Sequence, residues 1–184
     1  MIKRRALLAL AVSGVFCFPV SADGRREAAL KVFGPINERL SWMDDVALYK
    51  LKNAVVVEDL EREALVLHKA LDDAGAAGLD SASVEAFFRS QIAAAKAIQH
   101  RCLAQWQMGE APKGETVDLV DDVRPELIRI GAEFLENQRA YLLEFGPLTE
   151  ALWPLFLESV SVPKLSVLEK RQLFVDLMQI SLNN

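Results

Sequence analysis

The stretch INERLSWMDDVALYK, residues 36–50, has the pattern of an amphipathic helix whose apolar face carries a cation near each end. Arg39 and Lys50 are eleven residues apart, and at about 100° per residue they return to within roughly 20° of one direction. Between them on this face lie Met43, Val46 and Ala47. Long cationic side chains often lay their stems on apolar surface and keep their charges in water. A pair that holds an anion is the alternative interpretation.

Apolar residues recur at spacings of three and four along the rest of the chain, which predicts an all-α protein. Gly34-Pro35 is expected to interrupt the first helix, because proline removes a helical hydrogen bond. Asp59 is the predicted N-cap of the second helix, and Asp80 or Ser81 that of the third. We expect six helices, over residues 25–52, 60–76, 81–107, 119–145, 148–159 and 164–182.

The segment MGEAPKGETV, residues 108–117, is the clearest linker, with two glycines and a proline in ten residues. It separates two helical halves. Pro125 is expected in the first turn of the helix that follows, where proline is tolerated. Neither half is expected to cover its own apolar faces, so residues 23–184 are predicted to form a single all-α domain.

Residues 1–22 have the pattern of a cleaved secretory signal peptide. A basic MIKRR segment precedes the apolar run ALLALAVSGVFCFPV, and Val20-Ser21-Ala22 has the small residues of a cleavage site. A membrane anchor is the alternative, but the apolar run is shorter than the roughly 20 residues that a spanning helix needs. We therefore expect a periplasmic or secreted protein that is not attached to the membrane after cleavage.

The composition argues against several classes of function. Removing residues 1–22 takes away three cations and no acid, which moves the formal charge from −5 to −8. An acidic exported domain is a poor candidate for nucleic-acid binding. Cys102 is then the one remaining cysteine, which leaves no internal disulfide, and His68 and His100 stand alone in the sequence. We expect no metal site.

A second group of polar residues favours anion binding over a purely structural role for Arg39 and Lys50. Arg62 lies between two acids, Asp59 and Glu63, at the start of the second predicted helix, and Gln99 borders the apolar stripe of the third. Taken singly, Asp59 is most simply an N-cap, Glu63 a first-turn acid and Gln99 a core amide. Together these residues supply donors and acceptors for binding and electrostatic stabilisation.

Three stretches and one aromatic residue carry a resemblance to a known family. These are INERLSWMDDVALYK, VEDLEREALVL, GLDSASVEAFFRSQIAAAKAIQ and Trp106. Together they resemble the exported, gamma-type members of the all-helical AroQ class of chorismate mutases. The resemblance implies a helical bundle of the chorismate mutase II type, with the active site enclosed by the helices of one chain.

The resemblance also implies a role for each polar residue. Arg39 and Arg62 correspond to arginines that grip the substrate carboxylates, and Lys50 to a lysine that contacts the ether oxygen and a carboxylate. Gln99 corresponds to the residue that hydrogen-bonds the ether oxygen. Asp59 and Glu63 correspond to acids near the substrate hydroxyl, with Glu63 as the direct contact.

Two positions depart from the family pattern. Ala95 stands where relatives often have Ser or Thr, so one small donor is missing. The family's further arginine comes from the C-terminal half, but Glu133 occupies the most obvious corresponding position. Arg129, one turn earlier, is the residue that we expect to replace it, and Arg124 is the alternative.

The implied activity is that of an isomerase, which rearranges chorismate to prephenate within one molecule. Such a reaction requires no nucleophile, proton shuttle or cofactor, so chorismate is the expected partner and no cofactor is expected. Two other functions remain open from the sequence: a non-catalytic periplasmic binding or regulatory protein of the same fold, and a helical adaptor with an exposed apolar groove. A homodimer is also possible.

Overall fold

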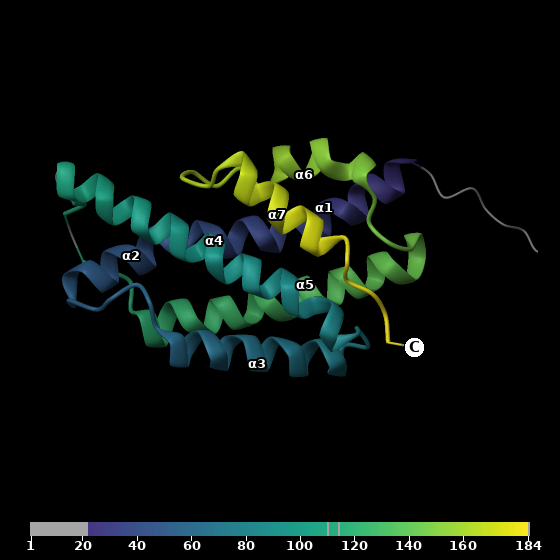
Figure 1. Ribbon diagram of the computed structural model, residues 1–184, viewed down its shortest axis with the longest axis horizontal. Coiled ribbons are helices and arrows are strands. Elements are labelled where there is room, and N and C mark those ends of the chain that lie inside the picture. The colour runs from purple at the N-terminus through teal and green to yellow at the C-terminus, as the bar shows by residue number, and fades with distance from the viewer. Residues whose placement is uncertain (1–21, 110, 114, 184) are drawn as a thin grey trace, which may run out of the picture.

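The computed structural model describes residues 22–109, 111–113 and 115–183. The predicted signal peptide therefore lies outside the described residues, except for Ala22, where the first helix begins. The described residues form α-helices with short irregular connections (Figure 1), which confirms the all-α prediction. The elements are α1 Ala22–Ser41, α2 Met43–Lys52, α3 Leu60–Ala76, α4 Ser81–Met108, the π-helical turn η1 Leu119–Val123, α5 Arg124–Phe145, the 3-10 turn η2 Glu150–Leu152, α6 Trp153–Ser159 and α7 Val167–Leu177.

The first predicted helix is divided at Trp42, and the predicted interruption at Gly34-Pro35 is wrong. Helix α1 runs through Pro35, which is buried within it. Proline cannot donate to the carbonyl four residues earlier, that of Lys31. The Asn137 side chain of α5 donates to this carbonyl at 3.0 Å. The tertiary contact replaces the lost hydrogen bond, so the helix continues.

The other predicted helices lie close to their expected positions. Asp59 and Asp80 cap α3 and α4, and their side chains accept from the backbone nitrogens of Arg62 and Ala82. The predicted linker is non-helical from Gly109 onward where it is described, and its first residue, Met108, ends α4. Pro125 lies in the first turn of α5. The last predicted helix is shorter than expected at both ends: a Ser166–Glu169 capping box starts α7 at Val167, and the helix ends at Leu177.

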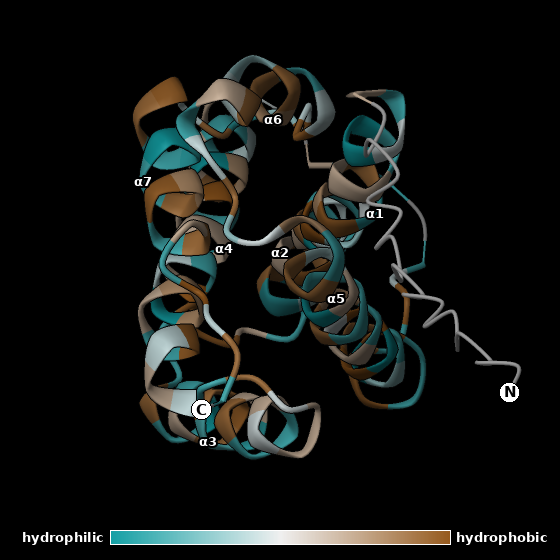
Figure 2. Cartoon of the chain, turned by 90° about the vertical axis from the view of Figure 1, so that its right-hand side faces the viewer, coloured by the Kyte–Doolittle hydropathy of each residue, from teal (hydrophilic) through white to brown (hydrophobic). Residues whose placement is uncertain are grey.

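Helices α3 and α5 lie on one side of the molecule and α6 and α7 on the other, with α1 and α4 between them (Figure 1). Apolar (brown) and polar (teal) segments alternate along the helices (Figure 2), as expected of amphipathic helices. The interior under α7 is aromatic: Phe174 lies 5.1 Å from Phe156 and 6.5 Å from Phe33 between ring centroids. A second aromatic group, Phe87, Phe88 and Phe134, joins α4 to α5.

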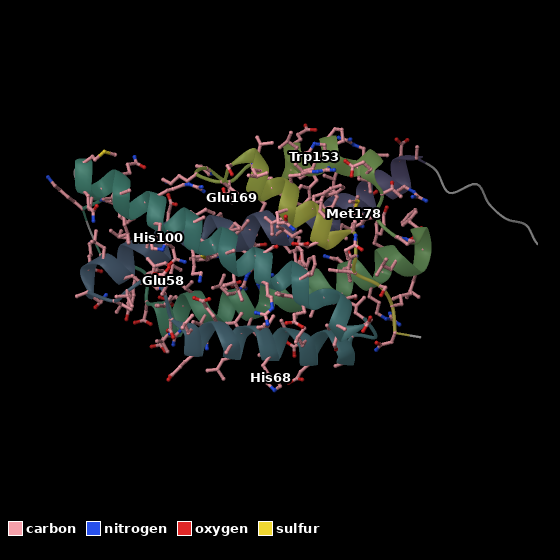
Figure 3. The ribbon with its side chains drawn as sticks, viewed as in Figure 1. Glu58, His68, His100, Trp153, Glu169 and Met178 are labelled. Carbon is pink, nitrogen blue, oxygen red and sulfur yellow. The ribbon has the colours of Figure 1, made fainter. Side chains whose placement is uncertain are left out.

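None of the helices in the described ranges is long and apolar enough to cross a membrane. The two histidines lie far apart (Figure 3). His100 contacts Glu58 at 2.9 Å, and His68 contacts Asp72 at 3.5 Å. Among the residues that the structure describes, no three His, Cys, Asp or Glu side chains are placed to hold a metal ion.

Candidate active site

A cavity of about 260 Å³ lies between α1, α2, α3, α4 and α5. Six of the sequence-predicted site residues line it, although they come from four helices and are up to 60 positions apart along the chain. These residues are Arg39, Lys50, Asp59, Arg62, Glu63 and Gln99. The fold therefore brings together the side chains that the sequence pattern singled out.

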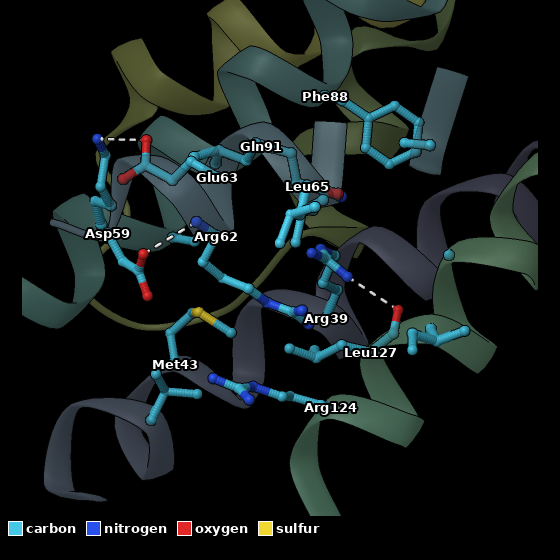
Figure 4. Close-up of a pocket in the computed structure, with 18 of the residues that line it drawn as sticks. Arg39, Met43, Asp59, Arg62, Glu63, Leu65, Phe88, Gln91, Arg124 and Leu127 are labelled. Carbon is cyan, nitrogen blue, oxygen red and sulfur yellow. Dashed lines mark hydrogen bonds and ion pairs between the residues drawn. The ribbon is translucent and has the colours of Figure 1, made fainter. Parts of the chain in front are cut away.

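Arg39, near the end of α1, is held by a backbone contact to α5. One of its terminal nitrogens donates to the Leu127 carbonyl at 2.9 Å (Figure 4). Burial, together with repulsion from Arg62, lowers the pKa of Arg39 to about 10. The guanidinium remains charged at neutral pH, and an anion in the cavity would relieve this electrostatic penalty.

Lys50, near the end of α2, is held in a similar way. Its Nζ donates to the Val57 carbonyl at 2.8 Å, in the connection between α2 and α3. Burial lowers the pKa of Lys50, although nearby carboxylates, of which Asp59 has the largest effect, act to raise it. A cation that is oriented by one backbone acceptor still has donors for a ligand.

Arg62 and Arg124 complete the cationic part of the cavity. The side chains of Arg39, Arg62 and Arg124 extend toward one region from three different helices (Figure 4). Burial and repulsion from Arg124 lower the pKa of Arg62. Three guanidinium groups that repel one another around one space form a strong anion site, because a dianion would turn this repulsion into attraction.

The acceptors in the cavity come from Glu63 and Gln99. Glu63 Oε2 pairs with Lys96 at 2.9 Å, whereas Glu63 Oε1 is buried and has no partner among the described residues. Gln99 Nε2 donates to the Ala95 carbonyl at 3.3 Å, and its Oε1 is likewise buried and unpartnered in the described part of the chain. Unsatisfied buried polar atoms are costly, and a bound ligand would satisfy them.

Asp59 has the structural role expected of an N-cap, since its Oδ1 accepts from the Arg62 backbone nitrogen at 3.0 Å. The same contact fixes the start of α3, the turn that carries Arg62 and Glu63. Asp59 also lines the cavity. Helix capping and placement of the neighbouring cation are therefore combined in one side chain.

Arg129 does not lie with the other predicted site residues. It is half exposed and forms ion pairs of 2.6–2.8 Å with Glu38, Glu126 and Glu133, and it is not part of the cavity wall. Arg124, the alternative in the sequence, occupies the cavity instead. Helix α5 turns by about 140° between positions 124 and 129, so the two side chains face different sides.

Sequence reasoning missed two further cavity residues. Lys96, which pairs with Glu63, was not singled out, although it lies three residues before Gln99 on α4. Gln91, which was not among the expected site residues, also lines the cavity. The signal for each is its spacing from Gln99, three or eight residues, which places each of them within about 80° of Gln99 around α4.

The fold and the cavity define an all-α protein with an internal anion site formed by the helices of one chain. Comparison with known proteins identifies its family: residues 32–100 match the model described as chorismate mutase type II. A monofunctional chorismate mutase from Enterobacter agglomerans is 31% identical over 145 residues, or 79% of either chain. The chain belongs to the chorismate mutase family.

Other relatives agree with this assignment. A secreted chorismate mutase from Yersinia pestis is 40% identical over 102 residues, and this alignment spans about half of either chain, 55% of this one and 54% of the relative. Its crystal structure superposes with a TM-score of 0.77 and 31% identity over 83% of this chain and 98% of that one. The crystal structure of a chorismate mutase from Burkholderia phymatum superposes with a TM-score of 0.68 and 26% sequence identity, over 81% of this chain and 93% of that one. These similarities confirm the expected fold.

Proposed function

We propose that this protein is a chorismate mutase that converts chorismate to prephenate in the cavity between α1 and α5. One observation carries the proposal: Arg39, Lys50, Arg62 and Arg124 line the same cavity as the unpartnered acceptors of Glu63 and Gln99. The substrate is a dianion with a hydroxyl group and an ether oxygen. The cavity offers a complementary group for each of these features.

The cavity would accelerate the reaction by restraint and by electrostatics. In the substrate, one carbon–oxygen bond breaks while one carbon–carbon bond forms, and no group leaves the molecule. Arg39 and Arg62, assisted by Arg124, would fix the two carboxylates so that the flexible side chain stays folded over the ring. Lys50 would stabilise the negative charge that grows on the ether oxygen as its bond breaks.

Gln99 would rotate its amide when substrate binds. In the structure its nitrogen is used by the Ala95 carbonyl and its oxygen is the unpartnered atom. An ether oxygen only accepts hydrogen bonds, so the nitrogen must face it. A rotation of about 180° around the last side-chain torsion exchanges the two atoms at low cost.

Glu63 would accept a hydrogen bond from the substrate hydroxyl through its unpartnered Oε1. Its other oxygen is held by Lys96 at 2.9 Å, which keeps the carboxylate oriented. Asp59 would act mainly through the helix that it caps. Ala95, also in the cavity wall, offers no side-chain donor, so Lys50 and Gln99 would carry the stabilisation of the ether oxygen.

The test is direct assay of the purified protein by loss of the ultraviolet absorbance of chorismate. We expect turnover by the unaltered protein and a loss of kcat of about 10²–10³ for Lys50→Ala, since its contact strengthens in the transition state. Arg39→Ala should raise KM as well. Binding of chorismate without turnover would leave a non-catalytic binding protein, and full activity in both variants would refute the assigned roles.

We also propose that the protein is exported. The relatives from Yersinia pestis and Mycolicibacterium smegmatis are secreted chorismate mutases, and residues 1–22 have the pattern of a signal peptide. Expression of the full chain followed by cell fractionation should place the activity in the periplasm or medium, with a new N-terminus at Asp23. Retention of intact chain in the cytoplasm would contradict export. The homodimer stays a prediction, which the molar mass of the purified protein tests.

A further inference from the structure

The cavity is longer than its cationic part. Helices α3 and α5 both run away from the cationic end, since Arg62 and Arg124 lie near their starts and the Arg139 side chain of α5 reaches Gly78, just beyond α3. The lining residues of α5 extend from Arg124 to Leu135, eleven residues, or about 16 Å of helix. Those of α4 extend from Gln99 back to Phe88.

The far part of the cavity, which we call the extension, has a mostly apolar wall. Its apolar residues come from α3, α4 and α5, namely Val66, Ala70, Phe88, Ile92, Gly131 and Leu135. Lys69 and Asp73 of α3 also line it, and they pair with each other at 2.9 Å. Phe88 and Gln91 lie on one side of the cavity, and Met43 and Arg124 lie on the opposite side (Figure 4). A ligand that filled both parts would need an anionic end and an apolar body.

Gly131 keeps the extension open. It lies in the interior of α5, where glycine destabilises a helix by roughly 1 kcal/mol relative to alanine. A Cβ at this position would meet no other atom within 4 Å, so packing does not require glycine. The missing side chain leaves volume in the cavity wall.

Gln91 supplies a polar atom within this apolar surface. The residue is 3% exposed and lines the cavity, yet its side-chain amide makes no hydrogen bond with any residue in the described ranges. Gln91 is not among the residues whose unpartnered polar atoms are fully buried, so its amide is accessible from the cavity and available to a ligand. Gln91 is eight residues, about 12 Å of helix, from Gln99 at the cationic end.

We propose that the extension binds the ring of an arylalkanoate anion, with the carboxylate on the arginines and a ring hydroxyl on Gln91. Such a ligand matches the charge of one end, the apolar wall of the other and the unpartnered amide. It would share the arginines with chorismate and therefore inhibit competitively. This regulatory role rests on the proposed function, whereas the binding itself does not.

The probe is 3-(4-hydroxyphenyl)propanoate, with 3-phenylpropanoate and propanoate as matched controls. Calorimetry on the purified protein should show one site and an affinity that falls in that order. The probe should raise the KM for chorismate and leave kcat unchanged. An affinity for propanoate equal to that of the probe, or inhibition that lowers kcat alone, would overturn the proposal.

Three variants test whether the ring lies in the extension. Gly131→Leu fills the open volume and should weaken the probe at least tenfold. Gly131→Ala, which adds one methyl group, keeps the test available if the leucine variant does not fold. It should weaken the probe less. Gln91→Leu should abolish the preference for the hydroxylated probe over 3-phenylpropanoate. Unchanged probe affinity in Gly131→Leu and Gly131→Ala would refute the site.

The two proposals fail separately. Turnover of chorismate without probe binding would refute the extension site and leave the mutase activity intact. Probe binding that is sensitive to Gly131→Leu, in a protein without turnover, would refute the proposed function and support the site.

Discussion

Arg39 and Lys50 show how single residues acquire their roles in this protein. Each is a cation on an apolar helical face, and each is held by one backbone carbonyl, that of Leu127 or Val57. A cation that merely extended into water would not need such contacts. Their lowered pKa values result mainly from burial, so both charges are kept in the cavity at an electrostatic cost. An anionic ligand offsets that cost.

Arg124 and Arg129 form a matched pair for testing the cavity. Arg124→Ala removes a cation from the cavity and should lower kcat/KM for chorismate about 10-fold or more, as expected for a charged hydrogen bond worth roughly 1.5–3 kcal/mol. Arg129→Ala removes surface ion pairs, which are worth little, and should leave kcat/KM within about twofold. Steady-state kinetics of both variants measure the difference. A larger loss of kcat/KM in Arg129→Ala than in Arg124→Ala would show that Arg129 is the arginine that contacts the substrate.

The pH dependence of kcat/KM should show activity through the neutral range and a fall on the alkaline side. Gln99 donates at any pH, so no acidic limb is needed, and a profile that rises steeply below about pH 5 would contradict its role. Burial lowers the pKa of Lys50, and activity falls as pH rises through that value because the cation is lost. In Lys50→Arg the fall should move upward, toward the pKa of Arg39 at about 10.

At the level of the individual helices, the sequence predicted the N-caps correctly but not the course of α1 through Pro35. The caps Asp59 and Asp80 were predictable, because an N-cap depends on residues within one turn. The continuation through Pro35 was not, because the Lys31 carbonyl finds its donor on Asn137, more than 100 residues away. The local sequence contains the proline that predicts a helix break. The hydrogen-bond donor that replaces the lost backbone bond lies on a neighbouring helix.

Asp80 allows the stability of one element to be tested apart from the site. Its Oδ1 accepts from the Ala82 backbone nitrogen at 3.1 Å, at the end of α4 that carries no proposed catalytic residue. Asp80→Ala should lower the free energy of unfolding by about 1 kcal/mol. Urea denaturation followed by circular dichroism measures this loss, and chorismate turnover serves as the control. Asp80→Asn retains the cap and should stay near the stability of the unaltered protein.

The C-terminal helices α6 and α7 stabilise the whole fold, although they contribute no residue to the cavity wall. Phe174 of α7 is fully buried against Phe33, Trp153 and Phe156. Further contacts fix the segment before α7: Asn37 accepts from the backbone nitrogens of Ser161 and Val162. The α6–α7 segment therefore supports α1, which carries Arg39.

Phe174→Ala should destabilise the entire domain by about 3–5 kcal/mol, the usual loss for a buried phenylalanine. Leu168→Ala on the same helix is the control, since Leu168 is 79% exposed and should change stability little. Thermal unfolding, followed by circular dichroism and by tryptophan fluorescence, should show one coincident transition in both variants. Two separate transitions would contradict the prediction of a single domain over residues 23–184.

The sequence by itself determined the helical class, most helix ends and six candidate site residues, because helical spacing and capping are local properties that can be counted along the chain. Only the tertiary structure decided between Arg124 and Arg129, because the rotation of α5 relative to α1 and α3 selects which arginine faces the cavity. It also decided that Lys96 pairs with Glu63 and that Gln91 and Gly131 line the same cavity. A cavity is formed by the surfaces that helices leave between them, and packing of the whole chain sets that separation.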